Sequence, residues 1–420
     1  MTWSVVHVDL RAGVSPRTDG TSPVYIVWWW GALPLGTTSH LPEELPLASD
    51  QLRGLAASLG ARQIWARSPN FGGIPGAASD GVPTLVLSLE AAAGDIDVAA
   101  LDRWSVPSAS TGENLSVIVC TRDRPEALRT CLRSLSAQRA PAAEIVVVDN
   151  SQARSAAGVA AEFPNVLYVH EPRPGLSVAR NTGIRRSSRP LVAFTDDDVE
   201  VEAGWTSEMV AAFDSDPGAE AICGLVAPAS LESTAQRYFQ FEIGGLGGKY
   251  LPIRFDQRFL DASIARGPQV WRVGAGANMA FRREVFDRVG NFDERLGAGA
   301  AGCSEDSELW YRIIANGGAC LYEPRVAVRH HHRTEWNALV RQVHAYMKGH
   351  TAALLVQHAL HGHRGNLRRA FLQLPRYFVH SGIDALLGWR RRRASILYAE
   401  VTGWIAGIAC GYRLRKGQRA

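Results

Sequence analysis

The sequence predicts an α/β protein: a central mixed sheet flanked by helices, preceded by an N-terminal α/β or β-rich accessory domain and followed by a C-terminal helical region. Three observations predict this fold class. The first 110 residues mix short β-rich runs with turn residues, strands alternate with amphipathic helices from Leu115 onwards, and long helical patterns follow residue 333. The 420 residues suffice for two or three domains. We predict their boundaries as 1–110, 111–333 and 334–420.

The composition is that of an ordinary globular protein, with 46% hydrophobic and 20% charged residues. The six cysteines are scattered without a C-x-x-C pair, so neither a zinc site nor a disulfide framework is expected. No signal peptide pattern opens the chain. The most apolar stretch, 396–412, contains Glu400 and three glycines, so we expect no membrane span. These features together predict a cytoplasmic protein.

Charge is distributed unevenly along the chain. From Arg333 to the last residue there are fifteen Lys and Arg against three acids, a net charge of +12, so a total of +4 leaves −8 for the rest. A basic tail on an acidic body indicates an anionic partner surface, either lipid headgroups or nucleic acid. The alternative is a solvated basic helix pair.

In the accessory domain, the runs 24–30 and 84–89 are strand candidates, and 34–36 contains turn residues. Trp28, Trp29 and Trp30 are consecutive. They would either form an aromatic surface for sugar or membrane, or occupy a buried strand, which is the commoner use of large aromatics. The segment 105–113 has the composition of a linker.

The central domain begins with a continuous apolar strand at 115–120, and Pro125 then suits the first turn of a helix. The alternation that follows is typical of a sheet with helices on both faces. We expect further strands at 144–148, 166–169, 191–195, 219–225 and 319–328, and helices at 125–135, 178–186, 204–213 and 307–316. In such sheets ligands bind at the carboxyl ends of the strands, which directs attention to residues 121–124, 149–151 and 196–198.

Three consecutive aspartates, Asp196, Asp197 and Asp198, follow an apolar strand. Unpaired adjacent carboxylates repel one another, and a divalent cation removes that cost. Mg²⁺ commonly takes one or two protein carboxylates together with water and substrate phosphates, as a nucleoside diphosphate site requires. The alternative is a solvated acidic turn, which is unusual at the end of a buried strand.

Other carboxylates also occupy selected positions. Asp149 closes the second central strand, where it would either accept hydrogen bonds from a ligand or cap the next helix. Glu305 and Asp306 follow a Gly/Ala-rich stretch at the start of a helix that Ser304 is placed to cap. There the helix dipole favours an ionised carboxylate, which a general base requires.

Two further motifs carry a weaker signal. His330, His331 and His332 follow a strand, and a carboxylate with an imidazole suits Mn²⁺ better than Mg²⁺, although at most one or two of the three can face one ion. A phosphate contact or simple exposure is equally compatible. The run from Gly244 to Lys249 (GGLGGK) lacks the strand and spacing of a phosphate loop, so we expect a mobile loop.

Six motifs now occur in one order and spacing: VIVCTRDRP at 117–125, VVVDNS at 146–151, ARNTG at 179–183, FTDDD at 194–198, GAGAN at 274–278 and SEDSE at 304–308. In this the chain resembles the family 2 glycosyltransferases, which have a GT-A fold. The resemblance covers residues 115 to about 333, roughly half the chain. Singly the motifs are weak, but six in order are specific.

The resemblance implies roles for individual residues. Thr121, Asp123 and Asp149 correspond to contacts with the nucleotide base and ribose, and Arg180 to a residue beside the base or diphosphate. The implied Asp-x-Asp motif spans Asp196, Asp197 and Asp198, with Asp198 the metal ligand and Asp196 nearer the ribose. Asp306, beside Glu305, corresponds to the catalytic base and His330 to a further metal ligand. Arg122 and Asp123 depart from the family's frequent Tyr-Asn.

The resemblance therefore implies an inverting transferase that uses Mn²⁺ or Mg²⁺, a nucleotide-sugar donor and a glycan or lipid-linked acceptor in polysaccharide or glycolipid assembly. Alternatives are a non-catalytic protein that binds sugar nucleotides or glycans, or a nucleotidyltransferase, although 121–125 is not the Gly-rich loop of that class. A dinucleotide-binding oxidoreductase lacks its G-x-G-x-x-G motif. No nucleic acid partner is expected, because binding of nucleic acid through the basic tail would leave the acidic sites unexplained.

The C-terminal region contains helical patterns at 336–358, 366–387 and 396–414, with Arg390 to Arg393 between the last two. Apolar faces beside clustered arginines are typical of interfacial membrane helices. One hypothesis is that this region docks on the cytoplasmic membrane face as a peripheral protein. The other is that the helices pack on the catalytic domain.

Overall fold

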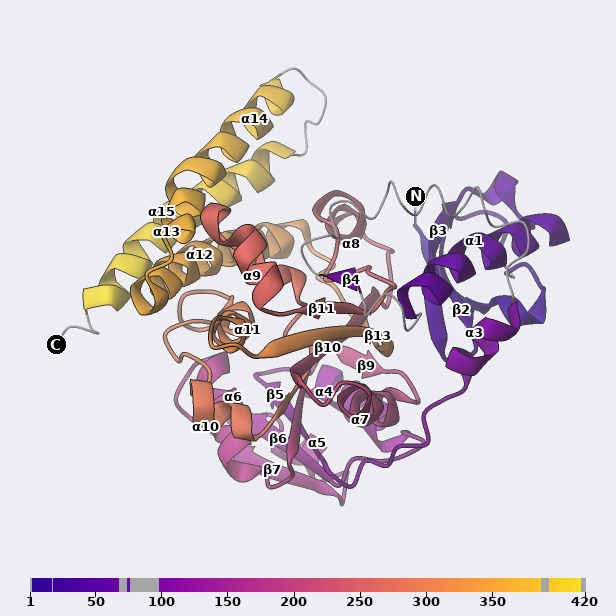
Figure 1. Ribbon diagram of the computed structural model, residues 1–420, viewed down its shortest axis with the longest axis horizontal. Helices are drawn as coiled ribbons and strands as arrows, with labels where there is room; N and C mark the ends of the chain where they lie inside the picture. The colour runs from indigo at the N-terminus through magenta and orange to yellow at the C-terminus, as the bar shows by residue number, and fades with distance from the viewer. Residues whose placement is uncertain (1, 17, 68–73, 76–97, 387–392, 417–420) are drawn as a thin grey trace.

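The computed structural model describes residues 2–16, 18–67, 74–75, 98–386 and 393–416. A small N-terminal sheet, a large central sheet covered by helices, and a group of C-terminal helices follow one another along the chain (Figure 1). The strand expected at 84–89 and the arginines at 390–392 lie outside the described residues.

The N-terminal sheet has three strands in the order β1 (Ser4–Asp9), β2 (Val24–Trp30) and β3 (Leu33–His40), with β1 parallel and β3 antiparallel to β2. Helices α1 (Ser49–Arg67) and α3 (Val98–Ser105) pack on it. Trp28 is completely buried and Trp30 nearly so. The expected strand at 24–30 is confirmed, and its tryptophans serve a core. Two short 3₁₀ turns complete this part, η1 (Leu10–Ala12) and η2 (Pro42–Glu44).

The central sheet is organised around β5 (Leu115–Thr121), whose seven residues are all buried. Its side chains alternate between the two faces. Val117 and Val119 pack with residues of α4 (Pro125–Ser136) and α7 (Trp205–Ser215). Ile118 and Cys120 pack on the opposite side, with residues of α6 (Leu176–Arg186) and α11 (Glu305–Ala315). Two hydrophobic layers therefore enclose the strand.

The strand order of the large sheet is β4-β11-β13-β10-β12-β8-β5-β6-β7, with β9 paired to β13. Strands β7, β6, β5 and β8 are parallel, and β12 is antiparallel to both of its neighbours. The predicted mixed sheet is confirmed. The remaining strands are β4 (Ile74–Pro75), β6 (Glu144–Asp149), β7 (Val166–His170), β8 (Leu191–Asp196), β9 (Val199–Val201), β10 (Ala219–Pro228), β11 (Ile253–Phe255), β12 (Asn278–Arg282) and β13 (Ala319–His330).

The helices expected in this domain are present within two residues of their predicted ends, and shorter elements join them. The segment after β10 forms a helix and a π-helical turn, followed by the glycine-rich run that we expected to be a loop. These additional elements are α5 (Ala157–Ala160), α8 (Thr234–Tyr238), η5 (Phe239–Ile243), α9 (Gln257–Ser263), η6 (Ile264–Arg266), η7 (Val270–Arg272) and α10 (Glu284–Val289).

The C-terminal region consists of α12 (Trp336–His361), α13 (Arg364–Arg368), a π-helical turn η8 (Arg369–Gln373), α14 (Leu374–Leu386) and α15 (Arg393–Lys416). Helices α14 and α15 extend away from the central sheet (Figure 1). The single helix expected at 366–387 is thus interrupted by η8. Pro375 follows that turn, and its missing N–H prevents regular α-helical bonding.

Helix α15 packs closely along α12 through three glycines spaced four residues apart. A Cβ added to Gly403, Gly407 or Gly411 would lie within 2.4 to 2.6 Å of atoms of α12. By length and composition alone, Ala394–Leu414 is apolar enough to cross a membrane, which differs from our sequence expectation. About a quarter of its most apolar window, 28%, is buried in the protein.

Candidate active site

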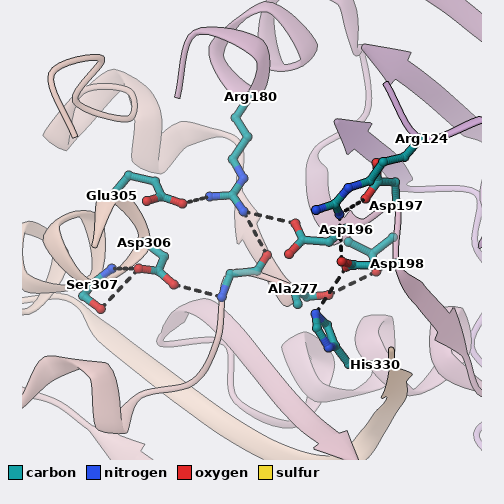
Figure 2. Close-up of polar contacts among 12 residues, drawn as sticks. Arg124, Arg180, Asp196, Asp197, Asp198, Ala277, Glu305, Asp306, Ser307 and His330 are labelled. Atoms are coloured by element: carbon teal, nitrogen blue, oxygen red, sulfur yellow. Dashed lines mark hydrogen bonds and ion pairs between the residues drawn. The ribbon is translucent and has the colours of Figure 1, made fainter. Parts of the chain in front are cut away.

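The three consecutive aspartates begin with the last residue of β8, Asp196, and point in different directions (Figure 2). Asp197 is buried and accepts a hydrogen bond from the Thr121 hydroxyl at 2.7 Å and one from Arg124 at 3.0 Å. Burial raises the pKa of Asp197 to about 6, and the charge of Asp198 adds to this effect. Asp197 therefore joins the ends of β5 and β8 and holds Arg124 in place.

Asp196, Asp198 and His330 form a group that can hold a metal ion, because their ligand atoms all lie within 4.8 Å of one another. The Nε2 atom of His330 is 3.2 Å from Oδ1 of Asp198. Burial alone would raise the pKa of Asp198, but its hydrogen bond with His330 and the nearby arginines outweigh burial and hold that pKa well below its usual range. Two carboxylates and an imidazole are suitable ligands for Mn²⁺ and for Mg²⁺.

The structure distinguishes the three consecutive histidines. His330 faces the acids, and its Nδ1 atom lies 2.9 Å from Nδ1 of His332. Burial lowers the pKa of His332 to about 3, so that ring is neutral. His331 instead points outward to Glu200, 2.7 Å away. Of the three histidines, only His330 belongs to the metal-capable group, and His332 contacts the ring nitrogen of His330 that faces away from the acids.

Arg180 on α6 is a buried cation between two acids (Figure 2). One of its guanidinium nitrogens donates to Glu305 at 2.6 Å, and the other lies 3.4 Å from Asp196. Burial raises the pKa of Glu305 to about 7, while the charge of Arg180 opposes the rise. Glu305 is thus engaged with Arg180, and the pair connects α11 to the acids that follow β8.

Asp306 lies in the first turn of α11, where the sequence placed it. Its carboxylate accepts hydrogen bonds from the backbone N–H of Gly276 at 2.9 Å and of Ser307 at 2.6 Å. These two donors fix the orientation of the carboxylate at the start of α11. The expected cap is wrong, however: Ser304 adopts a left-handed conformation, with φ of 72°, and its side chain makes no capping bond.

Two residues assigned to the nucleotide site lie elsewhere. Asp149 is completely buried, and it accepts hydrogen bonds from the N–H groups of Ser151 and Ala156 and from the Tyr168 hydroxyl. These bonds hold the carboxylate within its own loop, where one of its donors is the N–H of Ala156, the residue just before α5. Asp123 is exposed, has a positive φ of 58° and does not line the site cavity.

A cavity of about 1460 Å³ connects the remaining candidate residues. Thr121, Arg180 and the three aspartates line it, as do Glu305, Asp306 and His330. The C-terminal helices form one wall of this cavity through residues of α12, η8, α14 and α15. Helix α12 also packs on the loop that precedes α11, since Gly349 lies against the backbone of Cys303. The alternative in which these helices pack on the catalytic domain therefore holds for α12 and for the part of α15 that contacts it.

Comparison with known proteins agrees with this geometry. Residues 116–290 match the family model described as glycosyl transferase family 2. The chain carries a family 2 glycosyltransferase domain. The mixed sheet and its flanking helices have the architecture that the sequence resemblance implied.

Several curated proteins resemble the family 2 domain. The pre-mycofactocin glycosyltransferase of Mycobacterium tuberculosis is 28% identical over 60% of this chain and 50% of its own length. The succinoglycan biosynthesis protein ExoM of Rhizobium meliloti is 30% identical over 51% and 66%, respectively. The glucosyl-dolichyl phosphate glucuronosyltransferase of Haloferax volcanii is 26% identical over 54% and 72%. This chain therefore spans half the length of the first of these relatives and about two thirds of the second.

One solved structure to which the chain is similar is that of the mannosyltransferase PcManGT from Pyrobaculum calidifontis, determined with GDP-Man and Mn²⁺. It has a TM-score of 0.47 and 16% identity, covering 73% of this chain and 92% of that one.

The domain also contains site residues that the motifs did not reveal. Arg124 donates to Asp197 and, at 2.8 Å, to Asp198. His332 supports His330, and the N–H of Gly276 holds Asp306. Arg124 lies in the motif at 117–125, and His332 belongs to the same histidine run as His330. Both residues could have been found because they stand close in sequence to candidate site residues. Gly276 contributes only its backbone N–H, and the residue type gives no sign of such a contact.

Proposed function

We propose that this chain is an inverting, metal-dependent glycosyltransferase that moves a sugar from a nucleoside diphosphate sugar to an acceptor hydroxyl. One observation carries the proposal: in a chain whose residues 116–290 match family 2, a single cavity is lined both by a metal-capable group and by a carboxylate at a helix N-terminus, Asp306. A transferase of this kind requires both features, the first for the leaving diphosphate and the second for the attacking hydroxyl.

The donor's nucleotide would lie over the ends of β5 and β6, where Thr121, Arg122 and Asn150 line the cavity. Parallel strands place their ligand sites at this edge. Asp196 stands between these residues and the buried cation Arg180. The same edge thus supplies polar contacts for a base, a ribose and a diphosphate.

The metal would be held by Asp196, Asp198 and His330, whose donor atoms already lie close together. When bound there, the ion neutralises the charge that develops on the leaving diphosphate. Arg124 balances the excess negative charge of the two adjacent carboxylates Asp197 and Asp198. This set of ligands favours Mn²⁺ over Mg²⁺, because one of the three ligands is an imidazole nitrogen.

Asp306 would act as the general base. The acceptor oxygen attacks the anomeric carbon of the donor sugar while the bond from that carbon to the diphosphate oxygen breaks. The acceptor's hydroxyl proton passes to the Asp306 carboxylate, and the nucleoside diphosphate leaves with the bonding electron pair. Attack opposite the leaving group inverts the configuration at that carbon. Glu305 takes no proton in this scheme, since it holds Arg180.

The acceptor class is proposed from the relatives. One is named for succinoglycan biosynthesis and another for a glucosyl-dolichyl phosphate acceptor. A glycan or lipid-linked sugar, used in assembly of a cell-surface or secreted polysaccharide or glycolipid, is the acceptor we propose here.

We also propose that the protein associates peripherally with the cytoplasmic membrane face. Exposed apolar side chains recur on both projecting helices, including Val379 and Ile383 on α14 and Tyr398 and Ile405 on α15. The spacing of each pair places its members on one face of a helix. The net charge of +12 after residue 332 complements anionic lipid headgroups.

A donor panel tests the proposed reaction. The purified chain is incubated with UDP-, GDP- and dTDP-sugars in Mn²⁺, Mg²⁺ or EDTA, and the released nucleoside diphosphate is measured. We expect one donor to be hydrolysed slowly in a metal-dependent way, with loss of release in Asp198→Ala. Glu200→Gln is the matched control, because Glu200 lies two residues further on and contacts His331 outside the metal group.

The readout also separates the alternatives. A nucleotidyltransferase would release pyrophosphate rather than a nucleoside diphosphate. A non-catalytic binding protein would bind a sugar nucleotide in calorimetry and release nothing. Failure of every donor both to bind and to react would remove the proposed function.

A further inference from the structure

A group of cations lies at the end of the cavity opposite the nucleotide-binding edge. Lys249, Arg272 and Arg369 all line the cavity, and we call them the basic cluster. Lys249 stands over the rings of Phe255 on β11 and Tyr322 on β13, 5.1 and 5.4 Å from their centres. In the sheet order, β10, β12 and β8 separate these strands from β5 and β6. The basic cluster and the proposed nucleotide site are thus on opposite sides of Asp306, which is bonded to the segment that enters β12.

Short contacts connect the members of the basic cluster. The Lys249 ammonium donates to the backbone carbonyl of Arg272. The guanidinium of Arg369 stacks on Trp271, 4.4 Å from the ring centre, and its Nε lies 3.3 Å from His350. Trp271 and Arg272 are adjacent in η7, so Lys249 and Arg369 contact neighbouring residues of one turn.

Among the residues that the structure describes, neither Lys249 nor Arg369 makes an ion pair with a carboxylate. Burial lowers the pKa of Lys249 to about 8 and that of Arg369 to about 10, and no carboxylate opposes either change. The nearby ring of His350 is neutral, since burial lowers its pKa to about 3. The acid at this end of the cavity, Glu400, is engaged by the Tyr377 hydroxyl at 2.9 Å.

Holding two partly buried cations without a counter-charge is costly, and an anionic ligand removes that cost. A carboxylate would compensate one of the two charges. A phosphate group carries up to two negative charges and several acceptor oxygens, and it is the anion that Arg and Lys together commonly bind. The number of unmatched cations therefore favours a phosphate.

The position of the basic cluster suits an acceptor rather than a donor. All residues from Trp271 to Ala277 except Val273 line the cavity. Trp271, at the start of this segment, contacts Arg369, and Gly276, near its end, contacts Asp306. Four residue steps separate Arg272 from Gly276, at most about 14 Å of chain. A sugar that joins a phosphate on the cluster to a hydroxyl at Asp306 must therefore span no more than this length. The donor's own diphosphate belongs beside Asp198, on the other side of Asp306.

We propose that the basic cluster binds a phosphate group of the acceptor, so that this enzyme extends sugars attached to a phosphate. The proposal rests on the proposed function for its description of the ligand as an acceptor, but the phosphate site itself does not. The phosphate would belong either to a soluble sugar phosphate or to a prenyl-type lipid carrier, and both present the same group to Lys249 and Arg369.

Calorimetry on the full chain in EDTA tests the site, since removal of metal suppresses phosphate binding beside Asp198. The probes are inorganic phosphate, citronellyl phosphate and, as the uncharged comparison, citronellol. We expect both phosphates to bind and citronellol not to. Lys249→Gln and Arg369→Gln should each weaken phosphate binding at least about tenfold, and Arg369→Lys should weaken it less.

Arg368→Gln is the matched control, because Arg368 is the preceding residue and is exposed. It should change phosphate affinity less than about twofold. If Arg369→Gln does not fold, judged by its thermal transition, Lys249→Gln alone decides the test. Phosphate affinity that is equal in the unaltered chain and in Lys249→Gln would overturn the proposal.

Two comparisons are informative. The first distinguishes a lipid-linked phosphate from a soluble one, and the second distinguishes failure of this inference from failure of the proposed function. Tighter binding of citronellyl phosphate than of inorganic phosphate would identify a lipid carrier, and equal binding a soluble phosphate. Donor hydrolysis by the unaltered chain is measured independently. Hydrolysis without cluster-dependent phosphate binding would remove only this inference, whereas phosphate binding without hydrolysis of any donor would remove only the proposed function.

Discussion

At the scale of single residues, the three consecutive aspartates show how one motif supports three roles. Asp197 is buried and bonded to Thr121 and Arg124. Asp198 faces His330, and Asp196 lies beside Arg180. The middle residue of the run thus points away from its two neighbours. The middle residue maintains the structure, and the outer two are available to a cation.

This difference predicts opposite outcomes for two similar substitutions. Asp198→Asn removes a charged ligand, so Mn²⁺ affinity measured by calorimetry should fall at least about tenfold. Asp197→Asn weakens two buried hydrogen bonds, so it should lower the free energy of unfolding by about 1 to 3 kcal/mol while Mn²⁺ affinity stays within about threefold. Urea denaturation measures the second effect. A larger loss of Mn²⁺ affinity in Asp197→Asn than in Asp198→Asn would contradict these assignments.

His332 offers a test of how the imidazole ligand is oriented. For His330 to present Nε2 to a cation, its Nδ1 must carry the proton and donate it to Nδ1 of His332. Replacing such a supporting partner commonly reduces metal affinity about 10- to 100-fold. We expect this loss for His332→Leu in a Mn²⁺ titration.

His332→Gln supplies the control, because its amide oxygen can accept the same proton. It should recover part of the affinity lost in His332→Leu. Equal affinities for the leucine variant and the unaltered chain would show that the contact between the two rings has no part in metal binding.

At the scale of elements, α12 is coupled to the loop that presents Asp306. A Cβ added to Gly349 would lie 2.4 Å from the backbone oxygen of Cys303. Cys303 and Ser304 directly precede α11, so a displaced backbone there moves Asp306. Because misplacement of a catalytic group by about 1 Å can cost about 100-fold in rate, Gly349→Val should reduce transfer at saturating donor at least about tenfold.

Gly54→Val is the control for the effect of valine in a helix, since nothing lies within 4 Å of a Cβ at Gly54. It should leave the transfer rate within about twofold, as expected of an open helix position. Unchanged transfer in a folded Gly349→Val protein would show that α12 does not position the catalytic loop.

The elements that could be predicted from sequence are those with a clear period or a long apolar run. Strand β5, helix α4 and helix α11 fall within a few residues of their expected positions. Strand β12 was missed because its five residues follow a glycine-rich segment and show no extended pattern. Helix α1 was missed for a related reason, since apolar residues have little periodicity along it.

The same limit applies to the candidate site. Asp198 and Asp306 were predicted from separate motifs, and the family resemblance added His330; the structure places all three around one cavity. Asp149 has an equivalent position, but its side chain turns into its own loop, and sequence does not reveal that rotamer. Lys249 and Arg369 are far apart in sequence and line one cavity only because the C-terminal helices return over it.

At the scale of the whole molecule, the N-terminal part is fixed to the central sheet by polar contacts. Arg67 at the end of α1 forms an ion pair with Glu323 on β13 at 2.6 Å, and both side chains are about nine-tenths buried. Gln63 donates to the backbone carbonyl of Tyr250, next to Lys249 in the cavity wall. The accessory domain thus contacts the loop that carries Lys249 of the basic cluster.

The projecting helices at the other end give the last prediction. Val379 and Ile383 on α14 are 62% and 48% exposed, and Tyr398 and Ile405 on α15 are 71% and 55% exposed. Burying large apolar side chains in a bilayer interface is favourable by about 1.5 to 3 kcal/mol each when burial is complete. The surrounding basic residues add about 1 kcal/mol each on an anionic surface. The chain should therefore float with vesicles that contain anionic lipid, and release as salt is raised.

The double variant Val379→Glu/Ile383→Glu should reduce the fraction that floats at least about tenfold, because two carboxylates would have to enter the interface beside anionic headgroups. Both positions are exposed, so folding should be retained. Val106→Glu, 63% exposed in the irregular segment before β5, adds the same charge far from these helices and should float as the unaltered chain does. If both variants float equally, the apolar faces of α14 and α15 do not bind membrane, and the wall they form around the cavity is their whole contribution.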